Sequence, residues 1–154
     1  MEIRKPRKDE LHSIYLMGYD VWSEGMSVED YIKSCVDSGN YKSGTWYVLA
    51  SEDDLVASLI VYESQFNLPE KFCGIGSVAT AMQHRKQGYS SQLVNGICDI
   101  LEQSGYSGVY LHSDIDPKFY TRLGFIPVAQ DNARCMVRMF GSAKVPEDVI
   151  PTYF

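Results

Sequence analysis

The stretch of residues 72–105 constrains the fold most, because its pattern changes from strand-like to helical across a short loop. Residues 72–80 are mostly small or β-branched, and Gly74 and Gly76 leave room for another group to approach the backbone. After the loop, apolar residues recur at helical spacing until Gly105. The expected buried stripe is Leu93, Val94, Ile97, Ile100 and Leu101. A strand followed by such a helix predicts an α/β domain, with a right-handed crossover to a parallel strand.

Flanking patterns supply the other elements. One amphipathic helix is expected at residues 9–22, and a second begins at Ser27, whose hydroxyl can cap it, and ends at Gly39. A short opening strand precedes both helices, and the turn at residues 37–40 follows them. The remaining expected elements are a β-hairpin of residues 45–50 and 55–62, a strand at 109–112, a short helix begun by Asp116-Pro117 and ended by Gly124, and strands at 125–128 and 135–140 around a polar turn at Asp131-Asn132.

Composition limits the class of protein. The 154 residues are 45% hydrophobic and 22% charged, with no repeat or low-complexity segment, so we expect a single domain over residues 1–154. The net charge of −6 argues against a nucleic-acid partner, and no apolar run reaches the roughly 20 residues that span a bilayer. An acidic balance suits a cationic amine substrate, although solubility alone also accounts for it. A cytoplasmic location is the default expectation.

The cysteines give no sign of a metal or redox site. Four are present, with no C-x-x-C pair and no histidine at zinc-ligand spacing. We therefore expect no metal and reduced, mostly buried thiols: Cys35, Cys73, Cys98 and Cys135.

The loop between the small-residue strand and the long helix carries the first chemical signal. It reads Arg85-Lys86-Gln87-Gly88-Tyr89-Ser90-Ser91. The first amides of a helix have no intrahelical acceptor, and together with the helix dipole they form an anion site. A glycine near a helix start is as often structural as ligand-binding. A Walker A loop and a dinucleotide fingerprint are both excluded, because their glycine and lysine spacings are missing.

The surrounding residues resemble the GCN5-related N-acetyltransferase (GNAT) family. Ser77-Val78-Ala79-Thr80, followed after four residues by Arg85-x-x-Gly88-x-Ser90, is similar to the family's strand, loop and helix motif. Ser90 replaces the last small residue, and the proline that often precedes the loop is missing. The resemblance implies that acetyl-CoA is the cosubstrate, with its pyrophosphate on the loop. It also implies that the backbone of Val78, Ala79 and Thr80 contacts the pantetheine arm, although ordinary strand packing explains their side chains equally well.

A second block, Lys118-Phe119-Tyr120-Thr121-Arg122-Leu123-Gly124-Phe125, resembles the family's Phe-Tyr-x-x-x-Gly-Phe segment. Phe119 and Leu123 are four residues apart and are expected to share a buried face, with Tyr120 rotated toward the cofactor. Acetyl transfer to an amine expels a thiolate, so a nearby phenol can act as general acid. The resemblance assigns that role to Tyr120. The alternative is a tyrosine that only packs and hydrogen-bonds a carbonyl.

The general base is less defined. Glu63, at the end of the second hairpin strand, is the first candidate, and a merely solvated carboxylate is the alternative. His112 and Asp114 follow the strand at 109–112 and rank lower. The acceptor site is expected in the variable front half, where the acidic and aromatic segment 20–26 joins the first two helices.

The resemblance implies a GNAT-type mixed, mostly antiparallel sheet with a splayed parallel strand pair, flanked by about four helices. It implies transfer of an acetyl group to a primary amine of a small molecule or peptide, by direct attack and without a metal. No cysteine matches a nucleophile motif. The alternative function is a non-catalytic module that binds or senses acyl-CoA. Homodimers are frequent among similar proteins, so a homodimer is a further expectation.

Overall fold

The strands form one mixed sheet. The computed structural model describes residues 1–129, 132–147 and 149–154. Its seven-stranded sheet has the order β1-β2-β3-β4-β5-β7-β6, in which β4 and β5 are parallel and the pairs β1–β2, β2–β3, β5–β7 and β6–β7 antiparallel. This confirms the predicted fold class. The strands are β1 (Glu2–Arg4), β2 (Thr45–Ala50), β3 (Leu55–Glu63), β4 (Phe72–Thr80), β5 (Gly108–His112), β6 (Ile126–Ala129) and β7 (Asn132–Met139).

The helices are more numerous than the expected four. They are α1 (Leu11–Met17), α2 (Tyr19–Trp22), α3 (Val28–Asp37), α4 (Gly39–Ser43), α5 (Tyr89–Gln103) and α6 (Lys118–Thr121), with single 3₁₀ turns η1 (Lys8–Glu10) and η2 (Met82–His84). No helix in the described part of the chain is long and apolar enough to cross a membrane.

The predicted continuous helix at residues 9–22 is wrong, because the chain breaks at Gly18. There the backbone has φ −100° and ψ 3°, and α2 starts at the next residue. The ring of Trp22 lies against Gly18 so closely that a Cβ at residue 18 would sit 2.0 Å from Trp22 Cε3. A side chain at residue 18 would displace the ring, so the helical pattern is interrupted where the ring packs on glycine.

Two serines begin the next two helices. The Asp30 amide donates to Ser27 Oγ at 3.1 Å, which confirms the predicted cap of α3. The turn predicted at residues 37–40 is instead the start of α4. Ser38 Oγ accepts a hydrogen bond from the Tyr41 amide at 3.2 Å, so the same capping chemistry adds an extra helix that the sequence analysis missed.

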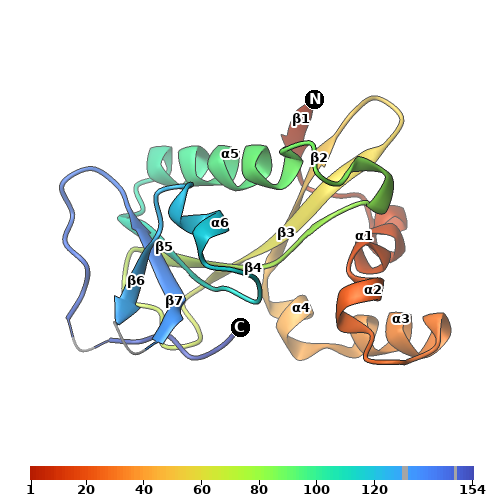
Figure 1. The fold of residues 1–154 in the computed structure, drawn as a ribbon, viewed down its shortest axis with the longest axis horizontal. Helices are drawn as coiled ribbons and strands as arrows, with labels where there is room; N and C mark the ends of the chain where they lie inside the picture. Colours follow the sequence, from red (N-terminus) through yellow and green to blue (C-terminus); the bar gives the residue numbers. More distant parts are fainter. Residues whose placement is uncertain (130–131, 148) are drawn as a thin grey trace. The chain divides into compact units, whose positions relative to one another are not determined.

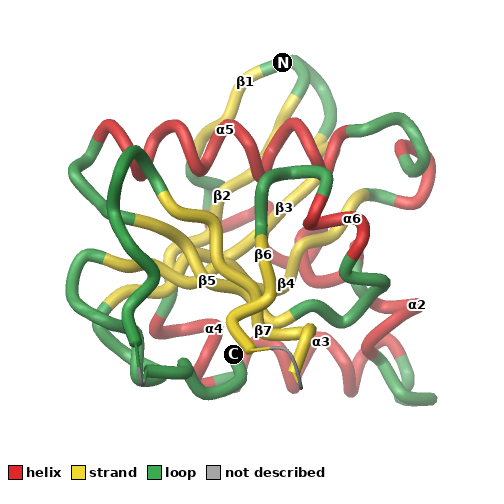
Figure 2. Tube along the Cα trace, turned by 60° about the vertical axis from the view of Figure 1, so that its left-hand side comes forward, coloured by secondary structure: helices red, strands yellow, loops and turns green. Residues whose placement is uncertain are grey.

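The chain divides into two compact units. The first unit comprises residues 1–61 and 77–94, and the second comprises residues 62–76 and 95–154. In the first unit β1, β2 and β3 lie side by side (Figure 1). In the second unit β7 lies between β5 and β6 (Figure 2). The single-domain assignment stays a prediction.

The cores follow the hydrophobic pattern with one correction. Val48, Leu49, Leu59 and Ile60 of the hairpin are fully buried, as its continuous runs of β-branched, aliphatic and aromatic residues predict. On α5 the buried residues are Leu93, Val94, Ile97, Cys98 and Leu101, whereas Ile100 is 39% exposed. Cys98 lies on the buried face because it is four residues after Val94 and three before Leu101, whereas Ile100 lies at the edge of that face, beyond Leu93.

The last two strands differ from prediction at their ends. β6 begins one residue later than expected, at Ile126, and β7 begins earlier, at Asn132. Residue 131 of the predicted polar turn lies outside the described residues.

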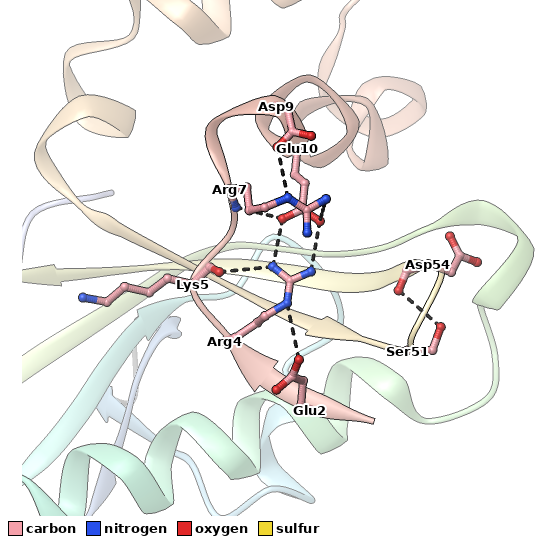
Figure 3. Close-up of polar contacts among 8 residues, drawn as sticks. All are labelled: Glu2, Arg4, Lys5, Arg7, Asp9, Glu10, Ser51 and Asp54. Carbon is pink, nitrogen blue, oxygen red and sulfur yellow. Dashed lines mark hydrogen bonds and ion pairs between the residues drawn. The ribbon is translucent and has the colours of Figure 1, made fainter.

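An ion-pair cluster fastens β1 to the start of α1 (Figure 3). Arg4 binds Glu10 through both guanidinium branches, with Nη1–Oε1 at 2.8 Å and Nη2–Oε2 at 3.0 Å. The Arg7 amide also donates to Glu10 Oε1 at 2.8 Å. The hydrogen bond from Arg4, opposed by burial and assisted by Arg7, lowers the pKa of Glu10 from 4.5 to about 2.

This cluster predicts an acid-sensitive contribution to stability. Because the pKa of Glu10 is lower in the folded state, its contribution is complete above about pH 5 and is lost as the pH falls toward 2. We expect Glu10→Gln to lower the free energy of unfolding at pH 7 by on the order of 2 kcal/mol, and by much less at pH 2.5. Urea unfolding at the two pH values measures this. Equal losses at both would contradict the ion-pair explanation.

Candidate active site

The second half of β4 is less buried than the first. Residues 72–76 are buried and residues 77–80 are half-buried, and the change occurs at Ser77, whose φ is +50°. A left-handed serine inside a strand is a strained, bulge-like feature of the kind found near functional sites. Ser77 Oγ donates to the Tyr41 hydroxyl at 3.2 Å, which holds the distortion. Val78, Ala79 and Thr80 therefore lie on the accessible part of the strand.

The predicted pyrophosphate loop follows directly. The Ala81 amide donates to Val56 O at 2.9 Å and fixes the strand end, and η2 leads from there into the loop. Lys86 has φ +63° and Gly88 has φ +83°, and a Cβ at residue 88 would meet no atom within 4 Å. The backbone therefore makes a turn at these two residues, and no atom of the described chain lies beside Gly88 at the Cβ position.

The backbone amides of this loop are not used in hydrogen bonds within the described chain. The first helical bond of α5 runs from the Gln92 amide to Gly88 O at 3.0 Å. Within the described chain, no backbone acceptor is recorded for the amides of residues 86–91. Free amides at the positive end of a 15-residue helix suit a phosphate group. The geometry therefore fits the pyrophosphate that the sequence predicted for Lys86, Gln87, Gly88, Tyr89, Ser90 and Ser91.

The Arg85 side chain is engaged elsewhere. Its Nε donates to Thr80 O at 3.1 Å, Nη2 donates to Met17 O at 3.0 Å, and both branches pair with Asp20. The hydrogen bonds that Arg85 donates to Asp20 raise the pKa of Arg85 and lower the pKa of Asp20. Asp20 lies in the segment that the sequence analysis assigned to the acceptor. Its role as a partner of Arg85 was missed, because the two are 65 residues apart.

Ser90 connects the loop to strand β4. Its hydroxyl is hydrogen-bonded to Thr80 Oγ1, which joins the first turn of α5 to the end of β4. The serine that departs from the motif thus adds a bond that glycine or alanine lacks.

Tyr120 lies in the second unit, on the four-residue helix α6. The sequence predicted about two turns, with Phe119 and Leu123 on the buried face. Instead Tyr120 is the buried residue, 7% exposed, and Phe119 and Leu123 are half-buried. The reason is the tight turn after α6, in which the Phe125 amide bonds to Tyr120 O at 3.1 Å and the two rings pack at 5.9 Å.

The Tyr120 hydroxyl has the properties of a proton donor. No hydrogen-bond partner for it is recorded among the described residues, and it is not one of their fully buried unpartnered atoms, which belong to Trp46, Ser58 and Tyr110. Burial, with a smaller effect of Asp114, raises the pKa of Tyr120 to about 12. The phenol is therefore protonated at neutral pH.

Glu63 lies elsewhere in the same unit. It accepts a hydrogen bond from the Tyr106 hydroxyl at 2.5 Å, and both residues line an open pocket of about 350 Å³. The bond to Glu63 raises the pKa of Tyr106. Tyr106 lies just before β5, whereas Asp114 and α6 follow it. Because the five residues of β5 rise about 3.3 Å each, Tyr106 and Asp114 lie at opposite ends of the strand. The structure does not bring Glu63 and Tyr120 together.

The two lower-ranked base candidates are covered by the carboxyl-terminal segment. His112 Nε2 lies 3.1 Å from Thr152 O, and the Tyr153 hydroxyl donates to both oxygens of Asp114 at 3.0 Å. Burial lowers the pKa of His112. The Phe154 ring packs on Gly74 and on Tyr62. The sequence analysis missed this segment, and its only local signal is the aromatic pair at its end.

No group of three or more His, Cys, Asp or Glu side chains that could hold a metal ion is found among the residues described. All four cysteines are free and buried.

A family model described as an acetyltransferase (GNAT) domain matches residues 2–128. The chain belongs to the GNAT family. The recognition made from the two motifs is thus confirmed, and both lie within the matched part of this GNAT chain. No curated protein sequence matches it.

Solved GNAT structures share the fold. A GNAT acetyltransferase from Brucella melitensis, solved with acetyl-CoA, is 17% identical, with a TM-score of 0.68 over 97% of this chain and 94% of that one. The GNAT protein YhbS from Escherichia coli, solved with CoA, is 19% identical, with a TM-score of 0.70 over 90% and 80%. A chimera of the Vibrio cholerae spermidine N-acetyltransferase SpeG is 15% identical, with a TM-score of 0.66 over 90% and 96%.

Proposed function

We propose that this protein transfers the acetyl group of acetyl-CoA to a primary amine of a small molecule or peptide, by direct attack of the neutral amine. The observation that carries the proposal is the loop of free amides at residues 86–91, at the start of α5, in a chain of the GNAT family. Acetyl-CoA supplies an activated thioester, and the loop amides hold its pyrophosphate. The accessible backbone of Val78, Ala79 and Thr80 lies next to the loop in the sequence and binds the pantetheine arm.

Tyr120 donates the proton that the leaving thiolate requires. A phenol with a pKa of about 12 stays protonated at neutral pH, and a hydroxyl without an internal partner is free to serve a ligand. That its hydroxyl faces the thioester stays a prediction.

Direct attack is favoured over a cysteine-bound intermediate by the state of the thiols. Burial raises the pKa of Cys73 to about 12, and those of Cys98 and Cys135 to about 11. Burial also raises the pKa of Cys35. A nucleophilic cysteine requires an accessible thiolate, which none of these four provides.

The acceptor is proposed to be a cationic amine. The chain has a net charge of −6, and the spermidine acetyltransferase with the same fold acts on a polyamine, according to its name. Glu63 is not proposed as the base, because it accepts a hydrogen bond from Tyr106 at the end of β5 opposite Asp114. The amine that attacks is the neutral form that exists in equilibrium with its cation in solution.

The proposal is tested by thiol release from acetyl-CoA with polyamines, amino acids, aminoglycosides and peptide amino termini, alongside calorimetric binding of acetyl-CoA. We expect micromolar to millimolar binding and turnover with at least one amine, well above hydrolysis. Binding without turnover on any amine would instead identify a non-catalytic acyl-CoA module. Absence of binding would refute both functions.

A further inference from the structure

The first residue of the cofactor loop is tied to helix α2 by a two-branched ion pair. Arg85 Nη1 lies 2.6 Å from Asp20 Oδ2, and Nη2 lies 2.9 Å from Asp20 Oδ1. A planar guanidinium that meets a carboxylate with both branches fixes orientation as well as distance. Lysine at residue 85 would lack this geometry.

The same guanidinium also reaches two other elements. It donates to Met17 O, at the end of α1, and to Thr80 O, at the end of β4. Arg85 therefore links α1, α2 and β4 at one point, and its donors are nearly all used. A side chain so engaged has little left to offer a phosphate.

Side-chain hydrogen bonds of the described residues anchor the loop at its two ends, and between them the Tyr89 ring contacts the His84 ring at 6.0 Å. Arg85 fixes the first end, and the contact of Ser90 with Thr80 fixes the second. Between them lie the left-handed Lys86 and Gly88, and the amides without an acceptor. The direction of those amides thus depends on where the two anchors hold the chain.

We propose that Asp20 is a positioning residue for acetyl-CoA binding: through Arg85 it holds the amides of residues 86–91 in the arrangement that receives the pyrophosphate. This inference rests on the proposed function. Arg85 acts through the loop and not as a phosphate ligand. Tyr19, next to Asp20, donates to Met26 O at 2.6 Å, so the segment expected to contact the acceptor is fastened to the same anchor.

A double-mutant cycle separates this role from direct phosphate binding. We expect Asp20→Asn and Arg85→Gln each to weaken acetyl-CoA binding about tenfold, and the double variant to be no weaker than either, because both break one link. If Arg85 bound the phosphate directly, Asp20→Asn would release it, and affinity would stay the same or improve. Calorimetry at fixed ionic strength gives the dissociation constants.

Asp9→Asn is the matched control. It removes another aspartate of the first unit that pairs with an arginine, at 3.2 Å from Arg7, and no interaction of Asp9 with residues 85–91 is found in the described part of the chain. We expect its acetyl-CoA affinity to equal that of the wild type. If Arg85→Gln does not fold, the acetyl-CoA affinities of Asp20→Asn and Asp9→Asn still test the proposal, since both substitutions keep the size of the side chain.

A readout without ligand distinguishes this inference from the proposed function. The Gln92 amide bonds to Gly88 O and so reports the loop conformation in the free protein. Its hydrogen exchange should be at least several-fold faster in Asp20→Asn and unchanged in Asp9→Asn. Wild-type exchange together with wild-type affinity in Asp20→Asn would overturn the positioning role. If the wild type binds no acetyl-CoA, the proposed function fails, and exchange alone decides whether Asp20 orders the loop.

Discussion

Replacing Tyr120 by Phe is expected to slow acetyl transfer by roughly 10²-fold or more, with acetyl-CoA affinity unchanged. The substitution keeps the ring that packs on Phe125 and removes only the proton donor. The loss should fall on kcat, because the phenol acts only when the thiolate leaves. Since product release can limit turnover, single-turnover rates with the amine identified by the screen are the deciding measurement.

Stability gives an independent check on Tyr120. Because no described residue hydrogen-bonds its hydroxyl, Tyr120→Phe should leave the midpoint of thermal unfolding within a degree or two. Tyr110→Phe is the matched control, since it removes a tyrosine hydroxyl from the same unit that is fully buried and has no hydrogen-bond partner among the described residues. Its single-turnover rate should equal that of the wild type. A wild-type rate in Tyr120→Phe would remove this residue from the chemistry.

The second large effect concerns Gly88. Gly88→Val is expected to weaken acetyl-CoA binding by on the order of 100-fold, because a β-branched residue disfavours the φ of +83° found there. A Cβ at this position meets no neighbouring atom, so the cost is a change of backbone and not a clash. The rearranged loop would no longer present its amides together. Calorimetric titration with acetyl-CoA measures the loss.

Two variants control for general strain. Gly105 ends the same helix with φ +96° and open space around it, so Gly105→Val imposes similar strain far along the chain from the loop. It should lower stability and keep the affinity. Gly88→Asn should retain most of the binding, since asparagine tolerates the left-handed region. Wild-type affinity in a folded Gly88→Val protein would exclude the loop from the cofactor site.

Local patterns were enough to locate most elements near the site. β4 was predicted at its observed bounds, and α5 to within two residues at each end, because an abrupt change of period and flanking glycines are local signals. The cap at Ser27 was also correct. The break at Gly18 was missed, since a single glycine in a helical pattern is usually tolerated and the packing of Trp22 decides the outcome.

Contacts between distant segments could not be read in this way. Three contacts join residues that are far apart in the sequence. They are the hydrogen bond from Tyr106 to Glu63, the hydrogen bond between His112 and Thr152 O, and the packing of Phe154 on Gly74. Such pairs depend on how strands and loops assemble, and no local propensity encodes them. The buried position of Tyr120 has the same cause, because the turn at Gly124 places Phe125 against its ring.

The sequence by itself determined the family, through two motifs that resemble it. It also determined the order of strand, loop and helix and the loop of free amides, because these follow from local periodicity, glycine positions and helix-end chemistry. Only the tertiary structure decided what the side chains do. Arg85 stands in the motif position of a phosphate loop, yet its guanidinium is bound by Asp20, because folding brings α2 to the end of β4 and the half-buried cation binds a carboxylate and two carbonyls there.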